Sequence, residues 1–197
     1  MTKSVSHEEP FNRFAEWLAK AEKSGEHEAN AMNLATASPE GRPSNRMVLL
    51  KGHDVDGFVF YTNYEGRKGQ ELLANPFASL CFHWKGLKRQ IRIEGAVETV
   101  GDEEADAYFN SRALNSRIGA WASQQSRPLD SKTKFLADVA AVTAKFAGKE
   151  ITRPPYWSGF RLVPDCIEFW EDGAFRLHNR DQYKKTVTGW TIDLLYP

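Results

Sequence analysis

Cationic side chains stand in pairs at two places in the first half of the chain, in positions that suit the binding of an anion. Arg46 and Lys51 bracket an apolar run. Strict alternation puts them on opposite faces of a strand, unless Lys51 lies beyond its end, and two solvated strand-end charges are the alternative. Arg67 and Lys68 follow Gly66 where a helix is expected to begin, and cations there oppose the helix dipole. A bound mononucleotide phosphate would resolve that conflict, and no dinucleotide or P-loop glycine pattern is present.

A phenol, a guanidinium and a hydroxyl follow at helical spacing. Tyr108, Arg112 and Ser116 are spaced four residues apart, so on one continuous helix they share a face. This set of donors suits phosphate recognition. A helix face exposed to solvent would show the same pattern, so the spacing alone leaves both interpretations open.

Near the end of the chain, three groups that can carry positive charge stand on alternate residues. Arg176, His178 and Arg180 follow the turn pair Asp172-Gly173, which predicts a tight hairpin. All three are therefore expected on one strand face. Like charges crowded on one face are unfavourable without an anionic partner. Trp170, on the other arm of the hairpin, could add an aromatic wall, and the pattern favours a binding site.

The elements that must position these groups are short strands with helices between them. Apolar residues recur at three- and four-residue steps from Phe11 to Ala21, which predicts an amphipathic helix. A second helical region is expected from Asp102 to about Ala147, with a break at Pro128. Strands are expected over residues 32–37, 46–50, 58–62, 77–84, 91–97, 167–171, 174–178 and 190–195. This pattern predicts an α+β, mainly β fold: an antiparallel barrel with peripheral and inserted helices.

Composition limits the class of protein. The 197 residues carry 26 Lys and Arg against 26 Asp and Glu, and 41% are hydrophobic. Those values are typical of a globular chain, not of a disordered one or a general nucleic-acid binder. No apolar run approaches the roughly 18 residues of a membrane span and no export signal is seen, so we expect a cytoplasmic protein with one domain over residues 11–197 after a flexible segment, 1–10. The two cysteines and five histidines lack metal-ligand spacing, which favours reduced thiols and no metal site.

Taken together, these groups of residues resemble the pyridoxine/pyridoxamine 5′-phosphate oxidases, a family of FMN-binding split β-barrels. The resemblance spans about residues 11–197. Its most specific pieces are Arg46–Lys51, Phe60–Asn63, Arg67-Lys68, Arg89-Gln90, Ile118–Trp121, Gln125-Ser126 and Arg176–His178 with Arg180. Each piece alone is weak, and their common order and spacing carry the resemblance.

The resemblance implies two sets of site residues. Those expected to contact FMN are Arg46, Met47, Val48, Leu49, Lys51, Tyr61, Thr62, Arg67, Lys68, Gln90, Gln125, Ser126, Trp170 and Arg180. Those expected to hold a phosphorylated pyridine substrate are Lys51, Tyr108, Arg112, Ser116, Arg176 and His178. Two of them are also expected to act in catalysis: Arg176 holds the substrate over the flavin, and His178 fixes its orientation.

The reaction that the resemblance implies oxidises pyridoxine 5′-phosphate or pyridoxamine 5′-phosphate to pyridoxal 5′-phosphate. A hydride passes to FMN and O2 reoxidises the flavin to give H2O2, while the protein orients the substrate and tunes the cofactor. The family is homodimeric, with two FMN sites shared between subunits. This sequence departs from the usual pattern of the family in three ways. Residues 1–10 lack the Arg and Tyr that close over the substrate in relatives, Asn179 stands in place of an Asp, and Leu194 stands in place of an Arg.

Three other functions fit parts of the pattern. A related split-barrel flavin oxidase could act on another ring substrate, as in phenazine biosynthesis, although the set of substrate-phosphate residues argues against it. A non-catalytic protein that binds FMN or pyridoxal phosphate would retain its ligand without turnover. A barrel could also bind single-stranded nucleic acid through aromatic residues and the cations between Lys85 and Arg92, which the neutral net charge disfavours.

Overall fold

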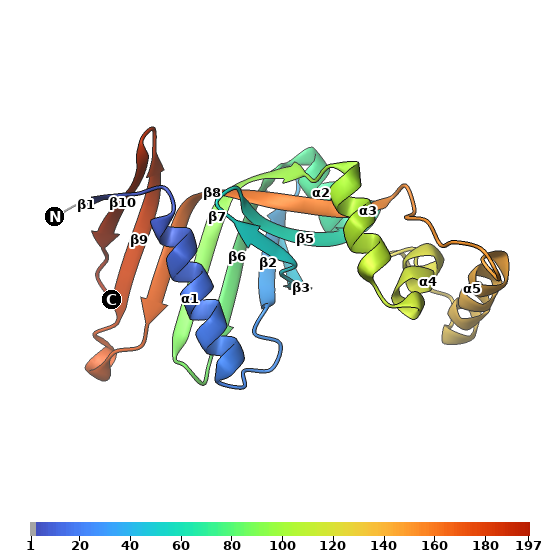
Figure 1. Ribbon diagram of the computed structural model, residues 1–197, viewed down its shortest axis with the longest axis horizontal. Helices are drawn as coiled ribbons and strands as arrows, with labels where there is room; N and C mark the ends of the chain where they lie inside the picture. Colours follow the sequence, from blue (N-terminus) through green and yellow to red (C-terminus); the bar gives the residue numbers. More distant parts are fainter. Residues whose placement is uncertain (1–2) are drawn as a thin grey trace.

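In the computed structural model, which describes residues 3–197, a large antiparallel sheet carries helices on one face and at one end (Figure 1). Its strands are β1 (Lys3–Val5), β2 (Ala31–Ala37), β3 (Pro43–Leu49), β4 (Gly52–Asp54), β5 (Gly57–Asn63), β6 (Phe77–Trp84), β7 (Arg89–Thr99), β8 (Trp157–Glu171), β9 (Asn179–Thr186) and β10 (Gly189–Leu194). The helices are α1 (Glu9–Lys23), α2 (Arg67–Ala74), α3 (Asp102–Ser111), α4 (Leu114–Ala122), α5 (Lys132–Lys145) and a 3-10 turn, η1 (Ala174–Arg176).

The sheet divides along its longest strand, β8. The strand order is β1-β10-β9-β8-β7-β6-β2-β3, while β5 pairs with β4 and with the first part of β8. The last part of β8 pairs with β9 instead. The register with β7 shifts between Glu94 and Gly95, where a Cβ on Gly95 would lie 2.1 Å from the Val163 carbonyl oxygen, so the strands approach too closely there for any other residue. The predicted antiparallel, mainly β fold is confirmed.

Helix α1 packs across the sheet with the apolar stripe that the sequence predicts (Figure 1). Phe14 is fully buried, and its ring meets Phe58 and Phe82 edge-on at centroid distances of 4.8 and 5.2 Å. One turn further on, Trp17 meets Phe169 edge-on at 5.2 Å. Burial of one such side chain contributes about 1.5–3 kcal/mol, so α1 ties β5, β6 and β8 into one core.

A second, smaller core joins the inserted helices to the sheet. Its buried residues are Phe109, Ile118, Ile151 and Trp157. Trp157 begins β8 and meets Phe109 of α3 edge-on at 5.2 Å, while it stacks on Tyr61 of β5 at 5.5 Å. These contacts fix α3 and α4 beside β5, where the cavity described below lies. None of the helices within residues 3–197 is long and apolar enough to cross a membrane.

Within the described residues, Lys3–Val5 pair with β10 and α1 begins at Glu9, while the flexibility of residues 1–10 stays a prediction. The structure differs from the sequence-based expectation near the other end of the chain. The expected strand over residues 174–178 is η1 and an irregular link, and the strand itself begins later, as β9. The single domain over residues 11–197 stays a prediction.

Candidate active site

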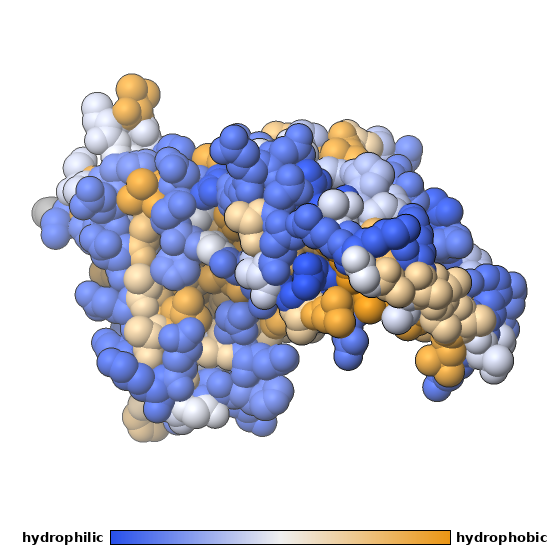
Figure 2. All heavy atoms as spheres, turned by 45° about the vertical axis from the view of Figure 1, so that its right-hand side comes forward, coloured by the Kyte–Doolittle hydropathy of each residue, from blue (hydrophilic) through white to orange (hydrophobic). Residues whose placement is uncertain are grey.

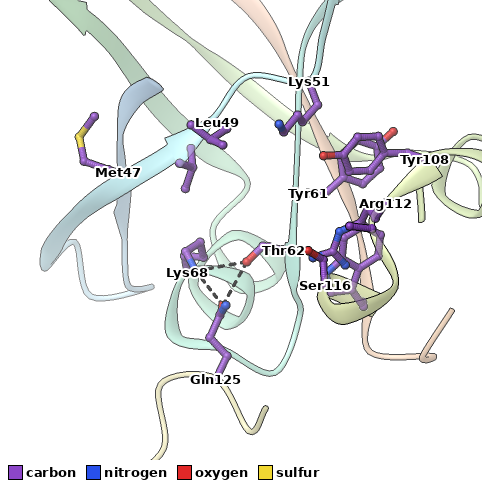
Figure 3. A pocket seen from close by; sticks show the side chains of 13 residues that line it. Met47, Leu49, Lys51, Tyr61, Thr62, Lys68, Tyr108, Arg112, Ser116 and Gln125 are labelled. Atoms are coloured by element: carbon purple, nitrogen blue, oxygen red, sulfur yellow. Dashed lines mark hydrogen bonds between the residues drawn. The ribbon is translucent and has the colours of Figure 1, made fainter. Parts of the chain in front are cut away.

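A cavity of about 480 Å³ opens between β3, β5 and the helices α2, α3 and α4 (Figure 3). Its lining residues are Met47, Val48, Leu49, Lys51, Tyr61, Thr62, Lys68, Tyr108, Arg112, Ala113, Ser116, Gln125 and Trp157. Three of these side chains are cationic, and none of the described residues that line the cavity is acidic. The cavity is therefore suited to an anionic ligand of small-molecule size.

Lys68 stands at the centre of a small hydrogen-bonded group on one side of the cavity (Figure 3). Its Nζ donates to Gln125 Oε1 at 2.7 Å and to Thr62 Oγ1 at 3.2 Å. Burial lowers the pKa of Lys68, and the nearby charge of Arg46 lowers it further. Helix α2 begins one residue earlier, without a side-chain cap and without an acidic residue in its first turn. A phosphate here would meet both the ammonium group and the positive end of the helix.

The opposite side of the cavity is built from aromatic rings and one guanidinium group. The rings of Tyr61 and Tyr108 stack with centroids 3.9 Å apart, and burial together with Glu104 raises the pKa of Tyr61 to about 12. Arg112 lies over the Trp157 ring at 4.6 Å. Its Nη1 is buried and has no hydrogen-bond acceptor among the described residues. Burial also lowers the pKa of Arg112. A buried guanidinium nitrogen left unpaired is costly, so its position indicates a missing anionic partner.

The three residues spaced four apart, Tyr108, Arg112 and Ser116, are distributed over two helices and the link between them. Helix α3 ends at Ser111 and α4 begins at Leu114, with Arg112 extended between them at φ −74° and ψ 149°. The condition of one continuous helix is therefore not met. Tyr108 and Ser116 nevertheless line the same cavity as Arg112.

The strand-parity problem at Arg46 and Lys51 is resolved by where the strand ends. β3 stops at Leu49, so Lys51 lies past its end and lines the cavity. Arg46 turns away from the lining and contacts Glu71, as does Arg67. These two arginines, both predicted to contact FMN, thus lie beside the cavity and share one buried carboxylate.

A second cluster of predicted site residues gathers around the connection between β8 and β9. The rings of Trp170 and His178 are 4.7 Å apart, and Gln90 of β7 lies opposite Trp170 in register. Arg180 donates through Nε to Glu168 Oε1 at 2.9 Å. None of these residues, and not Arg176, lines the cavity described above, and the connection lies at the far end of the molecule from α3 and α4 (Figure 1).

Residues 174–178 do not form the second strand of a tight hairpin, and this prediction is wrong. Phe175 and Arg176 adopt positive φ values of 57° and 65°, which break strand alternation. A Cβ on Gly173 would lie 1.9 Å from the Leu177 carbonyl oxygen, so glycine is needed for this tight loop. Only the last of the three predicted cations belongs to β9, so they do not share one strand face. Strained backbone of this kind is often found at functional sites.

Apolar side chains stand exposed beside both clusters. At the cavity, Met47 is 63% exposed and Leu114 is 55% exposed. In the second cluster, Phe175 is 95% exposed and Leu177 is 69% exposed. Figure 2 shows a largely hydrophilic face with apolar atoms gathered where the helical end meets the sheet. Exposed apolar groups beside two incomplete sets of ligands indicate a surface that another chain covers.

Several contributors to the site were not found from the sequence. Trp157 forms a wall of the cavity, but nothing in the sequence around it says what it packs against. Glu71 was also missed, although its position four residues after Arg67 on a helix could have suggested the ion pair. Ser126, by contrast, was predicted to contact FMN and faces a neighbouring cavity beside α5.

Comparison with known proteins agrees with these observations. Residues 18–146 match the family model described as "Pyridoxamine 5'-phosphate oxidase". Residues 157–197 match "Pyridoxine 5'-phosphate oxidase C-terminal dimerisation region", which contains four of the five residues of the second cluster named above, Trp170, Arg176, His178 and Arg180. A family of small-molecule oxidases is thus indicated over both parts of the chain.

Individual relatives give the same result. The chain is 57% identical over 197 residues to the pyridoxine/pyridoxamine 5′-phosphate oxidase of Sphingopyxis alaskensis. The aligned region covers 100% of this chain and 91% of the relative. It is 56% identical over 199 residues to the protein of the same name from Rhodospirillum rubrum, with 98% and 99% coverage. The chain belongs to the pyridoxine/pyridoxamine 5′-phosphate oxidase family.

Solved structures support the fold. The crystal structure of PhzG from Burkholderia lata 383, in complex with tetrahydrophenazine-1-carboxylic acid, superposes with a TM-score of 0.91 at 32% identity and covers 95% of this chain and 92% of that one. A pyridoxamine 5′-phosphate oxidase-related, FMN-binding protein from Nostoc punctiforme superposes at 0.74 with 18% identity over 99% and 100% of the two chains, which shows a shared fold.

Proposed function

We propose that this chain is an FMN-dependent oxidase that converts pyridoxine 5′-phosphate or pyridoxamine 5′-phosphate to pyridoxal 5′-phosphate, with O2 as the final acceptor. The observation that carries the proposal is the cavity itself, in which Arg112 offers a buried, unpaired guanidinium nitrogen next to Tyr108 and Ser116. Full-length identity above 50% to oxidases of this name supports it. The cytoplasmic location stays a prediction.

The residues present fit FMN. The uncapped start of α2 with Lys68, and the two arginines that share Glu71, would hold the flavin phosphate. Met47–Leu49, Tyr61 and Thr62 would lie along the rest of the cofactor. Bound FMN supplies the chemistry that no side chain here can, because it accepts a hydride and passes the electrons to O2.

We further propose a homodimer in which each site is assembled from both subunits. Within one chain the cavity and the second cluster lie at opposite ends, so one chain cannot bring all predicted ligands together (Figure 1). A second copy, related by a two-fold axis, would place Trp170, Arg176, His178 and Arg180 of the partner subunit against the open cavity. The match of residues 157–197 to a dimerisation region and the exposed Phe175 support this arrangement.

The side chains of the cavity would anchor the substrate by its phosphate. Arg112, Tyr108, Ser116 and Lys51 supply charged and neutral donors on one wall. Binding the phosphate at a distance from the reacting carbon uses remote contacts to set the position of the ring. Arg176 of the partner subunit would then hold the ring over the flavin and stabilise charge that develops during hydride transfer.

One experiment tests both the identity of the cofactor and the reaction. The purified protein is expected to be yellow, to release FMN and not FAD on heating, and to lose its flavin colour when pyridoxine 5′-phosphate is added without oxygen. Air should restore the colour. Retained FMN that does not bleach would instead identify a non-catalytic binding protein. Bleaching only by a phenazine precursor would favour the second oxidase class, to which the likeness to PhzG points.

The lowered pKa of Lys68 predicts a pH dependence of cofactor binding. A bound phosphate favours the charged ammonium group, so FMN affinity should fall as pH rises through this pKa, below the value of about 10.4 for an ordinary lysine. Kd should be measured from neutral pH to about pH 10. Riboflavin, which has the same ring and no phosphate, is the reference.

The matched variant is Lys68→Arg, which keeps its charge throughout this range. It should remove the alkaline loss of FMN affinity that the wild-type protein shows. Equal pH dependence for FMN and riboflavin, or an unchanged profile in Lys68→Arg, would contradict the assignment of Lys68 to the phosphate.

A further inference from the structure

A buried carboxylate lies directly behind the two arginines of the predicted phosphate site. Glu71 of α2 is 7% exposed. Its Oε2 accepts hydrogen bonds from Thr36 Oγ1 at 2.5 Å and Ser44 Oγ at 2.6 Å, and lies 3.3 Å from Arg46 Nη2. Its Oε1 accepts from Arg67 Nε at 2.8 Å. One carboxylate thus connects β2, β3 and α2 at the place where they meet the cavity.

This carboxylate is charged despite its burial. Burial by itself raises the pKa of Glu71, but the hydrogen bonds from Ser44 and Thr36 and the contact with Arg67 outweigh it and bring the pKa to about 2. Glu71 is therefore an anion at neutral pH. A buried charge is tolerated only when it is paired and hydrogen-bonded, and four donors meet that requirement here.

The negative charge also fixes the direction of the two hydroxyl groups. Because Thr36 and Ser44 donate their protons to Glu71, their oxygens are left to accept from the guanidinium of Arg46. Arg46 Nη1 donates to Thr36 Oγ1 and Nη2 donates to Ser44 Oγ, each at 2.5 Å. Nη1 also lies 3.3 Å from the Leu34 carbonyl oxygen. The guanidinium plane of Arg46 is thus held from several directions, and the two contacts with hydroxyl groups depend on Glu71.

We propose that Glu71 is a positioning residue for FMN binding: it holds Arg46 and Arg67 in the arrangement that receives the flavin phosphate. This inference rests on the proposed function. Arg46, Arg67 and Lys68 against Glu71 leave two net positive charges, which match a phosphate dianion. Without the carboxylate, three cations would stand close together with nothing between them before FMN arrives.

Replacement of Glu71 by glutamine separates positioning from simple charge. The side chain keeps its shape, but one of its two terminal oxygens becomes an NH2 group. That group then faces hydrogen-bond donors, either the hydroxyls of Thr36 and Ser44 or the guanidinium of Arg67. Either the hydroxyl pair with Arg46 or the Arg67 contact must then be lost. If only net charge mattered, removing a negative charge would tighten phosphate binding. If position matters more, binding weakens, so the two ideas predict opposite signs.

The experiment compares FMN with riboflavin in flavin-free protein. Kd for each is measured by flavin fluorescence in the wild-type chain and in Glu71→Gln. We expect FMN to bind about tenfold more weakly in the variant, as for the loss of a hydrogen bond to a charged group, and riboflavin to bind as before. Ser44→Ala removes one contact of Arg46 and one hydrogen bond to Glu71 but keeps the carboxylate, so it should shift the FMN value in the same direction by a smaller factor.

Asp138→Asn is the matched control, because it removes another i,i+4 ion pair, the one with Lys134 on α5. It should leave the affinities for FMN and for riboflavin unchanged. Equal or tighter FMN binding in Glu71→Gln, or an equal loss for FMN and riboflavin, overturns the inference. If Glu71→Gln does not fold, an unchanged FMN-to-riboflavin ratio in Ser44→Ala overturns it. A wild-type chain that does not prefer FMN over riboflavin contradicts the proposed function, and the inference fails with it.

Discussion

Arg112→Ala is expected to lower kcat/KM for pyridoxine 5′-phosphate by roughly 10- to 150-fold and to leave FMN bound. The guanidinium is held over Trp157 with one buried nitrogen free for the substrate phosphate. Loss of a charged hydrogen bond is commonly worth about 1.5–3 kcal/mol, which gives this range. Steady-state kinetics with the flavin-loaded dimer should show most of the effect in KM, because the phosphate is bound before and during the reaction.

Arg42→Ala is the matched control, since Arg42 is an exposed arginine outside the cavity. It should leave kcat/KM unchanged. Wild-type kinetics in Arg112→Ala, or loss of flavin with normal activity at saturating FMN, would show that Arg112 does not serve the substrate.

Arg176→Ala should lose at least about tenfold in kcat/KM and keep its yellow colour and its dimeric state. Arg176 lies on the strained loop between β8 and β9, away from the Lys68 side of its own cavity. In the dimer its charge would act on the substrate ring and not on the flavin phosphate. A lost charged hydrogen bond again corresponds to about 1.5–3 kcal/mol.

Flavin content, light scattering and kinetics on the same sample test this division of roles. Lys185→Ala changes an exposed cation of β9 and should behave as the wild type. If Arg176→Ala loses its flavin while its activity at saturating FMN is normal, the assignment of Arg176 to the substrate is wrong.

Periodicity predicted most of the fold where packing and local pattern agree. The apolar stripe of α1 and the strand β6 (Phe77–Trp84) lie where the sequence places them, because one buried face dictates each pattern. β9 was missed, since Asn179–Thr186 carries few apolar residues and is held by pairing with β8 and β10. Tertiary pairing of this kind leaves little trace in the local sequence.

The site shows the same limit. Even spacing suggested a helix face at Tyr108 to Ser116 and a strand face at Arg176 to Arg180, and in both places the backbone breaks the period. At the first place all three residues nevertheless line the cavity. Their spacing singled them out as a group, and the family resemblance gave them a role toward substrate that stays a prediction. Glu71 and Trp157 depend on contacts between distant segments, which a single sequence does not reveal.

In the proposed homodimer, each active site takes residues from two subunits. Arg112→Ala and Arg176→Ala subunits, carrying different tags, can be combined and the heterodimer purified. In that dimer one site carries both substitutions and the other carries neither, so about half of the wild-type activity per dimer should return from two nearly inactive parents. If the heterodimer is no more active than its parents, both residues serve a site within one chain, and the shared-site arrangement is wrong.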